Sequence, residues 1–485
     1  MSSFHSSATV LLGLLGLGLA QLRSVQGGPL LQSWCSTTDL KQQLQEQAAL
    51  RFDGGSARGL VLKVDESRTC QTMLGLGSSL EPSTCSNLWR LDAAERARVM
   101  NRLVNPTNGI GMNLMRICIG TPDFTGDPWY SYDDLPTGDT DPDLRRFSIA
   151  RDRQYILPIL KLARANNPDL LFFASPWSPP GWMKSTGTMI GGSVLPQHYA
   201  VYAEYFVRFI QAYKEEGIPI FAVTVQNEPG VDRAKEKNPK WFYPSCRWTG
   251  QQERDFIRDY LGPVFRKHGL KTQIWSYDHN YNRDPSVSGD DPGLAYPRAV
   301  LSDARAAGCV AGVAFHGYAG RPEDMSAFHQ EFPNVPLYFT EGSTFGLDGA
   351  GELIARLRNW ASGYNAWVTM LDNKGEPNNG PFPASRTCVT LETGTLKPSY
   401  HFDFFMYGQF MKFVRRGAKR IESTADGALP ANVAFQNPDG SLVLIVVNND
   451  SAPKPCAIEW RGQQAPLRLT PQSVTTFVWN GSRSK

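Results

Sequence analysis

The stretch Gly217-Ile-Pro-Ile-Phe-Ala-Val-Thr-Val-Gln-Asn-Glu-Pro-Gly230 contains the pattern that decides the fold. Six apolar or β-branched residues, Ile220–Val225, predict a short buried strand, and polar residues follow at once. Amphipathic segments typical of helices stand on both sides of it, at Ala200–Glu216 and Gln251–His268. A buried strand between helices is the repeating unit of a parallel α/β sheet.

The same alternation extends over about 340 residues. We expect strands at Met73–Gly77, Met112–Ile117, Leu170–Ala174, Ile220–Val225, Gln273–Tyr277, Gly312–Phe315, Val335–Thr340 and Tyr364–Leu371. Further helices are expected at Leu91–Leu103, Arg153–Arg164, Pro297–Ala307 and Ala350–Asn359. Eight such units predict an α/β fold, a (β/α)₈ TIM barrel over residues 71–415. A doubly wound sheet is the competing architecture, but Gly75-Leu-Gly77-Ser-Ser lacks the third glycine of a dinucleotide-binding loop.

The two ends of the chain have a different pattern. Residues 28 to about 72 are strand-poor apart from Gly59–Val64. The last 65 residues predict a hairpin, Ala431–Gln436 and Ser441–Asn448, around a turn-rich centre. Short strands continue at Ala457–Trp460, Leu467–Leu469 and Ser473–Trp479. We therefore expect a small all-β side domain, sandwich-like, formed by residues 28–70 and 416–485.

The N-terminus is typical of a secretory leader. The apolar run Ala8–Ala20 is too short to span a bilayer, so residues 1–20 are interpreted as a signal peptide, with an uncleaved anchor as the alternative. A secreted or lysosomal location follows. It agrees with two glycosylation sequons, at Asn449 and Asn480. Three of the eight cysteines, Cys35, Cys70 and Cys85, cluster near the mature N-terminus and suggest a disulfide.

The composition excludes some partners. The net charge is +3 and no dense Lys/Arg run occurs, so a nucleic-acid partner is not expected. Twelve Trp and 17 Tyr residues are a generous supply of the flat, amphipathic rings that sugar clefts use, although most aromatic side chains serve the core.

Two glutamates stand at the ends of expected strands, Glu228 and Glu341. Catalytic groups of a TIM barrel gather at the carboxyl ends of the strands. Glycosidic hydrolysis needs two carboxyl groups, one to protonate the leaving oxygen and one to attack the anomeric carbon or to activate water. The competing interpretation is a pair of structural carboxylates bound by arginine or by backbone groups. Arg116, at the end of the second strand, is interpreted as such a buried carboxylate partner, with direct sugar contact as the alternative.

The chain resembles glycoside hydrolase family 30 of clan A, which includes the lysosomal glucosylceramidases. The resemblance runs from about residue 71 to about residue 480. Its ordered motifs are Arg116 with Asp123-Phe124, Ala174-Ser-Pro-Trp177, Asn227-Glu228-Pro229, Arg254-Asp-Phe-Ile, His316-Gly-Tyr318, Phe339-Thr-Glu341, Trp367 with Gly375-Glu-Pro-Asn378, and Gly408-Gln-Phe-Met-Lys-Phe.

The resemblance implies roles residue by residue. Glu228 matches the general acid/base and Glu341 the nucleophile of a retaining β-glucosidase. Positions that bind substrate are matched by Asp123, Trp177, Asn227, His316, Tyr318 and Trp367. For His316, orienting hydrogen bonds and direct sugar contact both remain open. No cofactor and no metal are implied, because carboxylate catalysis needs neither.

The expected substrate is a β-glucoside, with glucosylceramide first and a β-1,6-glucan or another β-glucoside or β-xyloside as the alternative. A glycolipid substrate would bring peripheral membrane contact. The Gly after His316, the Val-Thr-Met after Trp367 and the segment Trp177–Trp182 depart from the vertebrate lysosomal pattern. An inactive sugar-binding barrel is the rival from another class.

The carboxylate pair also carries an expectation about pH. The charge of Glu341 should raise the pKa of Glu228, which gives an optimum at roughly pH 5–6.

Overall fold

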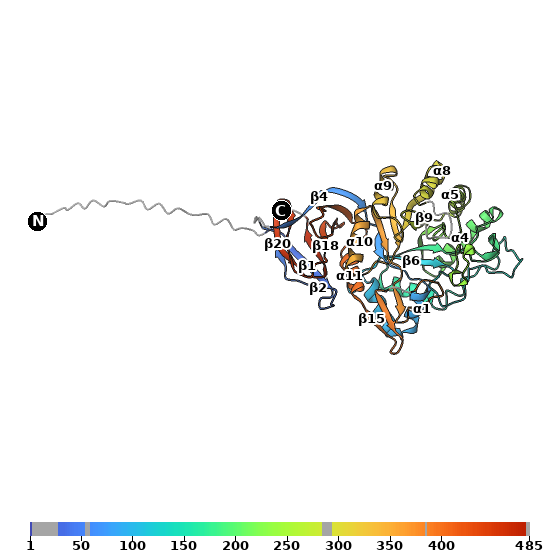
Figure 1. Cartoon of the computed structure of the whole chain (residues 1–485), viewed down its shortest axis with the longest axis horizontal. Helices are drawn as coiled ribbons and strands as arrows, with labels where there is room; N and C mark the ends of the chain where they lie inside the picture. The colour runs from blue at the N-terminus through green and yellow to red at the C-terminus, as the bar shows by residue number, and fades with distance from the viewer. Residues whose placement is uncertain (2–27, 54–58, 284–292, 384–385, 482–485) are drawn as a thin grey trace.

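The structure is a computed structural model of the 485-residue chain. It describes residues 1, 28–53, 59–283, 293–383 and 386–481. Figure 1 shows a barrel with its helices on one side of the molecule and a β-sandwich on the other, where the C-terminus also lies. Residues 2–20 of the expected signal peptide lie outside the described residues.

The barrel is an eight-stranded sheet whose neighbours are all parallel, in the order β5-β12-β11-β10-β9-β8-β7-β6. Its strands are β5 Gly75–Gly77, β6 Leu114–Ile119, β7 Leu171–Pro176, β8 Ile220–Thr224, β9 Gln273–Asn280, β10 Val310–His316, β11 Leu337–Glu341 and β12 Ala361–Asn365. The ring closes just beyond β5, where Arg116 N donates to Ser78 O (3.0 Å) and Leu80 N donates to Arg116 O (2.8 Å). The (β/α)₈ expectation is confirmed.

Helices cover the outside of the barrel (Figure 1). They are α1 Pro82–Arg90, α2 Ala93–Val104, α3 Ile156–Asn166, α4 Tyr199–Glu215, α5 Gly250–Phe256, α6 Gly262–Lys267, α7 Ala295–Leu301, α8 Ala304–Ala307, α9 Glu323–Glu331, α10 Gly346–Arg358 and α11 Phe402–Met411. The expected helix 251–268 is α5 and α6 joined by the π-turn Ile257–Leu261. The expected helix 297–307 breaks in two because the Asp303 side chain accepts hydrogen bonds from Arg305 N and Ala306 N and so starts a new helix.

The eighth strand was placed too far along the chain. β12 ends at Asn365, so Trp367 lies in the following loop and not in the strand. The Asn365 side chain donates to Ser78 O (2.9 Å) and Leu114 O (2.8 Å), which ties the end of β12 to the neighbouring strands. The apolar run continues past this point into a separate three-stranded sheet, β13 Met370–Asp372, β14 Val389–Glu392 and β15 Lys397–Tyr400.

The side domain is one ten-stranded sheet in the order β2-β1-β21-β18-β17-β16-β4-β19-β20, with β3 paired to β1. Its strands are β1 Leu30–Thr37, β2 Gln45–Glu46, β3 Leu50–Arg51, β4 Leu60–Thr72, β16 Lys419–Ser423, β17 Asn432–Gln436, β18 Ser441–Asn448, β19 Lys454–Trp460, β20 Gln463–Leu469 and β21 Ser473–Asn480. Both chain ends contribute to it, as expected, and the β17–β18 hairpin is present.

The N-terminal part of this domain is richer in strands than expected. β1 pairs antiparallel with β21 from Gln32 to Thr37 and lies inside the sheet. Its sequence, Leu-Leu-Gln-Ser-Trp-Cys-Ser-Thr, mixes polar and apolar residues, so periodicity did not mark it. The Gln409 side chain of α11 donates to Ser36 Oγ (2.7 Å) and accepts from Thr476 Oγ1 (2.7 Å), which joins the sheet to the barrel.

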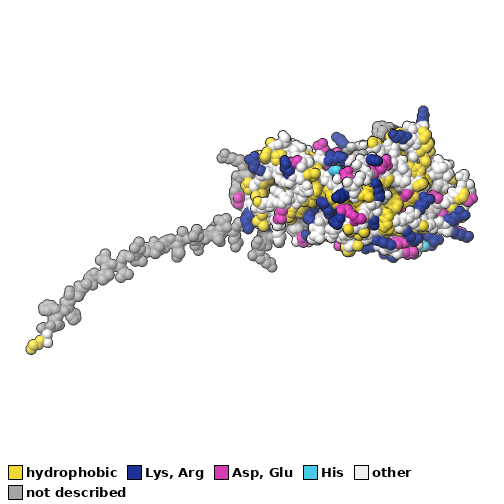
Figure 2. Space-filling model, turned by 90° about the horizontal axis from the view of Figure 1, so that it is seen from below, with side chains coloured by type: hydrophobic (Ala, Val, Ile, Leu, Met, Phe, Trp, Pro, Cys, Tyr) yellow, Lys and Arg dark blue, Asp and Glu magenta, His cyan; other side chains and the backbone are white. Residues whose placement is uncertain are grey.

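The disulfide expectation is wrong for this structure. All eight cysteines lie among the described residues and all are free thiols. Cys35 is in β1, Cys70 in β4 and Cys85 in α1, so nearness in sequence did not become pairing in space. Among the helices of the described ranges, none is long and apolar enough to cross a membrane. On the face shown in Figure 2, Lys and Arg side chains are interspersed with Asp and Glu.

Candidate active site

The cavity at the carboxyl ends of the barrel strands contains nearly all the predicted site residues. It has a volume of about 510 Å³. Seven of the eight predicted residues line it, namely Asp123, Trp177, Asn227, Glu228, Tyr318, Glu341 and Trp367. The eighth, His316, does not line it and is fully buried. Of the two roles that the sequence leaves open for His316, this position favours orienting hydrogen bonds over direct sugar contact.

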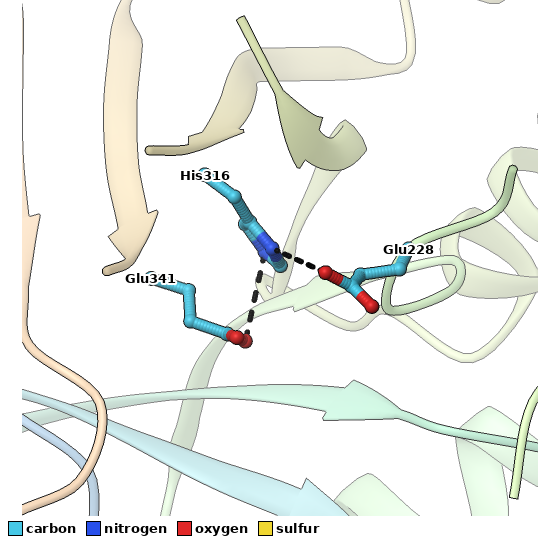
Figure 3. A group of neighbouring side chains, drawn as sticks. All are labelled: Glu228, His316 and Glu341. Carbon is cyan, nitrogen blue, oxygen red and sulfur yellow. Dashed lines mark ion pairs between the residues drawn. The ribbon is translucent and has the colours of Figure 1, made fainter. Parts of the chain in front are cut away.

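Glu228, His316 and Glu341 form a tight group (Figure 3). The imidazole lies between the two carboxylates, with Nδ1 3.4 Å from Glu228 Oε1 and Nε2 3.8 Å from Glu341 Oε2. One oxygen of each carboxylate and a ring nitrogen lie within 4.8 Å of one another. Retaining glycosidases place their carboxyl groups about 5–5.5 Å apart, whereas inverting enzymes leave about 6.5–9.5 Å for a water molecule. The separation therefore fits the retaining class.

The loop after β8 holds Glu228 in an unusual backbone conformation. Its φ is +48°, in the left-handed region that a residue with a side chain rarely adopts. Its N–H donates to Asp278 O (3.0 Å) and its carbonyl accepts from Val231 N (2.9 Å). These two bonds hold the backbone, so the carboxylate is presented to the cavity from a fixed position. Left-handed geometry at a non-glycine residue before proline was not foreseeable from the sequence.

Glu341 is the last residue of β11 and is held on both oxygens. Arg116, fully buried, forms an ion pair with Glu341 Oε2. Tyr318 Oη donates to Glu341 Oε1 (2.9 Å). The Arg116 guanidinium also donates to Asn227 Oδ1 (2.7 Å) and to Asp278 Oδ2 (2.8 Å). The interpretation of Arg116 as a buried carboxylate partner is thus confirmed, and these contacts fix one carboxylate orientation.

Asp278 is a positioning residue that sequence reasoning did not select. It is fully buried, at the end of β9, with a φ of +64°. Its carboxylate accepts hydrogen bonds from Arg116, Ser175, Thr224 and Thr340, and His316 Nε2 lies 3.1 Å away. Burial alone would raise its pKa, but Arg116 and His316 hold the pKa of Asp278 well below its usual range.

The charges around His316 decide where the proton of this group lies. Burial opposes a charge on the ring, but Glu341, Asp278 and Glu228 around it raise the pKa of His316 to about 9. Burial would likewise raise the pKa of Glu228, but His316 and the nearby positive groups, including Arg233, hold the pKa of Glu228 below its usual value. The expectation of a raised pKa for Glu228 is therefore wrong in direction for the free enzyme, because it considered only the two carboxylates.

A histidine substitution tests this arrangement through the pH profile. The pair of Glu228 and His316 keeps a proton until the pH passes the raised pKa of His316, so the alkaline limb of kcat/KM should lie nearer pH 9 than pH 6. In His316→Asn the cation is lost, and burial with the charge of Glu341 should return the proton to Glu228. The alkaline limb should then fall by more than about one pH unit.

The control for this profile is His329→Asn. His329 stacks on Trp360 at 3.6 Å between ring centroids and lies in α9, away from the site cavity. Its loss should leave both limbs of the profile in place. An unchanged alkaline limb in folded His316→Asn would contradict the shared proton.

Aromatic side chains and one buried carboxyl group form another part of the cavity wall. Trp177 and Trp367 stack at 5.1 Å between centroids, and Phe124 meets Trp367 edge-on at 5.9 Å. Asp123 is buried, and its Oδ1 has no hydrogen-bond partner among the described residues. Burial, with the charges of Glu341 and Glu228, raises the pKa of Asp123 to about 8. A carboxyl group in this state both donates to and accepts from a sugar hydroxyl.

Glu228, His316 and Glu341 offer metal-ligating atoms, and in the described part of the chain they are the group that could hold an ion. The charges argue against that use. Glu341 already carries an ion pair with Arg116, and the imidazole between the carboxylates has a raised pKa. A divalent cation would have to displace a proton and approach a buried guanidinium.

The cavity also has a rim that the sequence did not reveal. Arg233, Trp241 and Tyr243 come from the loop after β8, and Phe382 from the loop after β13. They lie outside the expected strands, and no motif marked them. For Arg233, Trp241 and Tyr243 the signal would have been position alone, close after Glu228 in the chain, and Phe382 had no such signal.

Comparisons with known proteins agree with this geometry. The model of the glycosyl hydrolase family 30 TIM-barrel domain matches residues 73–382, and that of the family's β-sandwich domain matches residues 417–477. An endo-1,6-β-D-glucanase of Neurospora crassa is 33% identical over 443 residues, covering 86% of this chain and 88% of the relative. The lysosomal acid glucosylceramidase of Mus musculus is 28% identical over 455 residues, covering 87% and 84%.

Among solved structures, that of the endo-β1,6-glucanase BT3312 superposes with a TM-score of 0.82 at 30% identity, and the match covers 94% of this chain and all of that one. The family model alone spans more than half of the chain. The protein is a glycoside hydrolase, and it belongs to glycosyl hydrolase family 30.

Proposed function

We propose that the protein hydrolyses β-glucosidic bonds with retention of configuration, with Glu341 as nucleophile and Glu228 as general acid/base. The observation that carries this proposal is the carboxylate pair itself, with oxygens within 4.8 Å of each other at the edge of a cavity lined by indoles. Asp123, Trp177, Asn227 and Trp367 would hold the terminal sugar, while Tyr318 and the buried Arg116 orient Glu341.

The reaction would proceed in two displacements. In the first, a Glu341 oxygen bonds to the anomeric carbon while the bond to the leaving oxygen breaks, and Glu228 gives its proton to that oxygen. In the second, Glu228 takes a proton from water, the water oxygen bonds to the same carbon, and Glu341 leaves as a carboxylate. Two inversions restore the β configuration.

His316 would supply and hold the proton that this cycle needs. In the free enzyme the imidazole lies 3.4 Å from Glu228 Oε1 and has a raised pKa. When Glu341 becomes an ester its negative charge disappears, and one of the groups that favours the imidazolium is lost. Proton movement between His316 and Glu228 would therefore follow the charge on Glu341.

For the substrate we propose a β-1,6-linked glucan. This choice rests on similar proteins at 30% identity or more that are named as endo-1,6-β-glucanases. Glucosylceramide, the first expectation from the sequence, becomes the second candidate. It is favoured by the relation to the mouse glucosylceramidase. A glycolipid substrate would make membrane contact part of this second candidate alone.

A substrate panel should separate these possibilities. We expect the enzyme to release reducing sugar from β-1,6-glucan at least about 100-fold faster than ceramide from glucosylceramide, because the guanidinium of Arg233 lines the cavity and favours a leaving group with several hydroxyl groups. NMR of the first product should show the β anomer. Activity on glucosylceramide alone would contradict the choice of glucan, and a first-formed α anomer would contradict retention.

We also propose that the protein enters the secretory route and is secreted or lysosomal. The support is the apolar run Ala8–Ala20 and the two sequons, whose Asn449 and Asn480 are both exposed at the surface of the side domain.

A further inference from the structure

The rim on the Glu228 side of the cavity combines one cation with three aromatic rings. Arg233 stands five residues after Glu228 and is 6% exposed. Its guanidinium carbon lies 4.6 Å from the centre of the Tyr243 ring, 5.6 Å from that of Trp241 and 5.9 Å from that of Phe382. All four side chains line the cavity.

Arg233 is held in place but not saturated. One terminal nitrogen donates to Tyr243 Oη (2.5 Å) and the other to Glu236 Oε1 (2.9 Å). Its Nε is buried and has no hydrogen-bond partner among the described residues. A buried N–H without an acceptor is costly, and proteins retain such groups where a ligand or water supplies the acceptor.

The proposed mechanism indicates which part of the substrate this side of the cavity contacts. A general acid must lie next to the oxygen that leaves, so the walls near Glu228 face the leaving group. Trp177, Trp367 and Asp123, which we propose to hold the terminal sugar, come from other loops, and Tyr243 belongs to the same hydrophobic cluster as the two indoles. Rings with a fixed donor suit a polyol, which offers both C–H faces and hydroxyl oxygens. Beside its glycosidic oxygen ceramide presents an amide carbonyl and a hydroxyl, fewer acceptors for a buried guanidinium than the hydroxyl groups of a glucosyl unit.

We propose that Arg233, with Trp241, Tyr243 and Phe382, forms the leaving-group subsite and that it binds a sugar. Arg233 donates to hydroxyl oxygens of the leaving glucosyl unit while the three rings contact its faces. This inference rests on the proposed function, and it adds the chemical class of the leaving group and the residue that selects it.

The test is transglycosylation, in which an added sugar takes the glycosyl group from the enzyme. The subsite that releases the leaving sugar must also bind this acceptor. An aryl β-glucoside with an activated leaving group forms the glycosyl-enzyme without any leaving sugar. Added methyl β-glucoside then competes with water, and the ratio of transfer to hydrolysis measures acceptor binding. Both reactions use Glu228 as base, so a general loss of activity cancels from the ratio.

In Arg233→Met the ratio should fall about 10- to 100-fold, the loss expected for a hydrogen bond to a charged group, and kcat/KM on β-1,6-linked oligosaccharides should fall similarly. Hydrolysis of the aryl glucoside is followed across pH in the same variant, because Arg233 also lowers the pKa of Glu228, and the ratio of transfer to hydrolysis is compared at the optimum of each enzyme. Arg233→Lys should recover part of the ratio, since it keeps the charge but not the fork. The matched control is Lys235→Met, in the same 3-10 turn, Arg233–Lys235, with a side chain that is 56% exposed and does not line the cavity.

Three results would overturn the inference. They are an unchanged ratio in folded Arg233→Met, an equal loss in Lys235→Met, and a wild-type enzyme that transfers nothing to a sugar. None of these coincides with failure of the proposed function, which would appear as hydrolysis of the aryl glucoside that persists in Glu341→Gln.

Discussion

Glu341→Gln should reduce turnover by a factor on the order of 10⁴ or more, for poor and activated leaving groups alike. The amide oxygen is a weak nucleophile, and no other described carboxylate in the cavity is placed to replace it. Asp123 has a pKa raised to about 8 and lines the cavity beside Trp177 and Trp367. The measurement is kcat/KM on an aryl β-glucoside and on a β-1,6-linked oligosaccharide.

The variant should remain folded, because Arg116 keeps its ion pair with Asp278 and the amide oxygen can still accept from it. Equal melting temperatures for the variant and the wild type would show this. Glu331→Gln is a suitable control, since this exposed carboxylate in α9 pairs only at the surface with Arg298. If the Glu341→Gln enzyme kept a tenth of the wild-type activity, Glu341 would not be the nucleophile.

Glu228→Gln should show the second largest effect, and its size should depend on the leaving group. General acid catalysis contributes about 10²–10⁴-fold when the leaving oxygen needs a proton. A β-1,6-linked sugar is such a group, so its kcat/KM should fall by that amount. An activated phenolate leaves without a proton, so the first step on an aryl glucoside should be nearly unaffected while hydrolysis of the glycosyl-enzyme becomes slow.

Azide provides the internal check for both variants. A strong anionic nucleophile needs no base, so it should restore turnover of the aryl glucoside in Glu228→Gln and give a β-glucosyl azide. In Glu341→Gln any azide product must form by direct displacement and carry the α configuration. The same losses on both substrates in Glu228→Gln, with no response to azide, would contradict its role as acid and base.

The sequence was sufficient for the architecture because the barrel strands are buried on all sides. Such strands are continuous apolar runs, as in Ile220–Thr224, and their alternation with amphipathic helices leaves few folds open. It failed where neighbouring context decides. The run from Tyr364 to Leu371 is apolar throughout, and only the hydrogen bonds of Asn365 to two neighbouring strands end β12. β1 was missed because its polar and apolar residues do not alternate regularly.

In the candidate site, too, some residues could be identified from the sequence and others could not. Glu228 and Glu341 were identifiable because a carboxylate directly after a buried strand needs a partner or a task. Asp278 also follows such a strand, but its five contacts come from five other segments of the chain, which no local pattern can report. The direction of the Glu228 pKa differs from the expectation because the expectation considered only the charge of Glu341, whereas His316 and Arg233 also act on Glu228.

The central claim is that Glu341 forms a covalent bond to the sugar. An activated 2-deoxy-2-fluoro-β-glucoside tests it most directly, because the fluorine slows both displacements and the activated leaving group speeds only the first, so the glycosyl-enzyme accumulates. Incubation followed by proteolysis and mass spectrometry should find one fluoroglucosyl group on the peptide that contains Glu341, and none in Glu341→Gln. A label on Glu228, or an enzyme that turns over without ever carrying a label, would contradict the account.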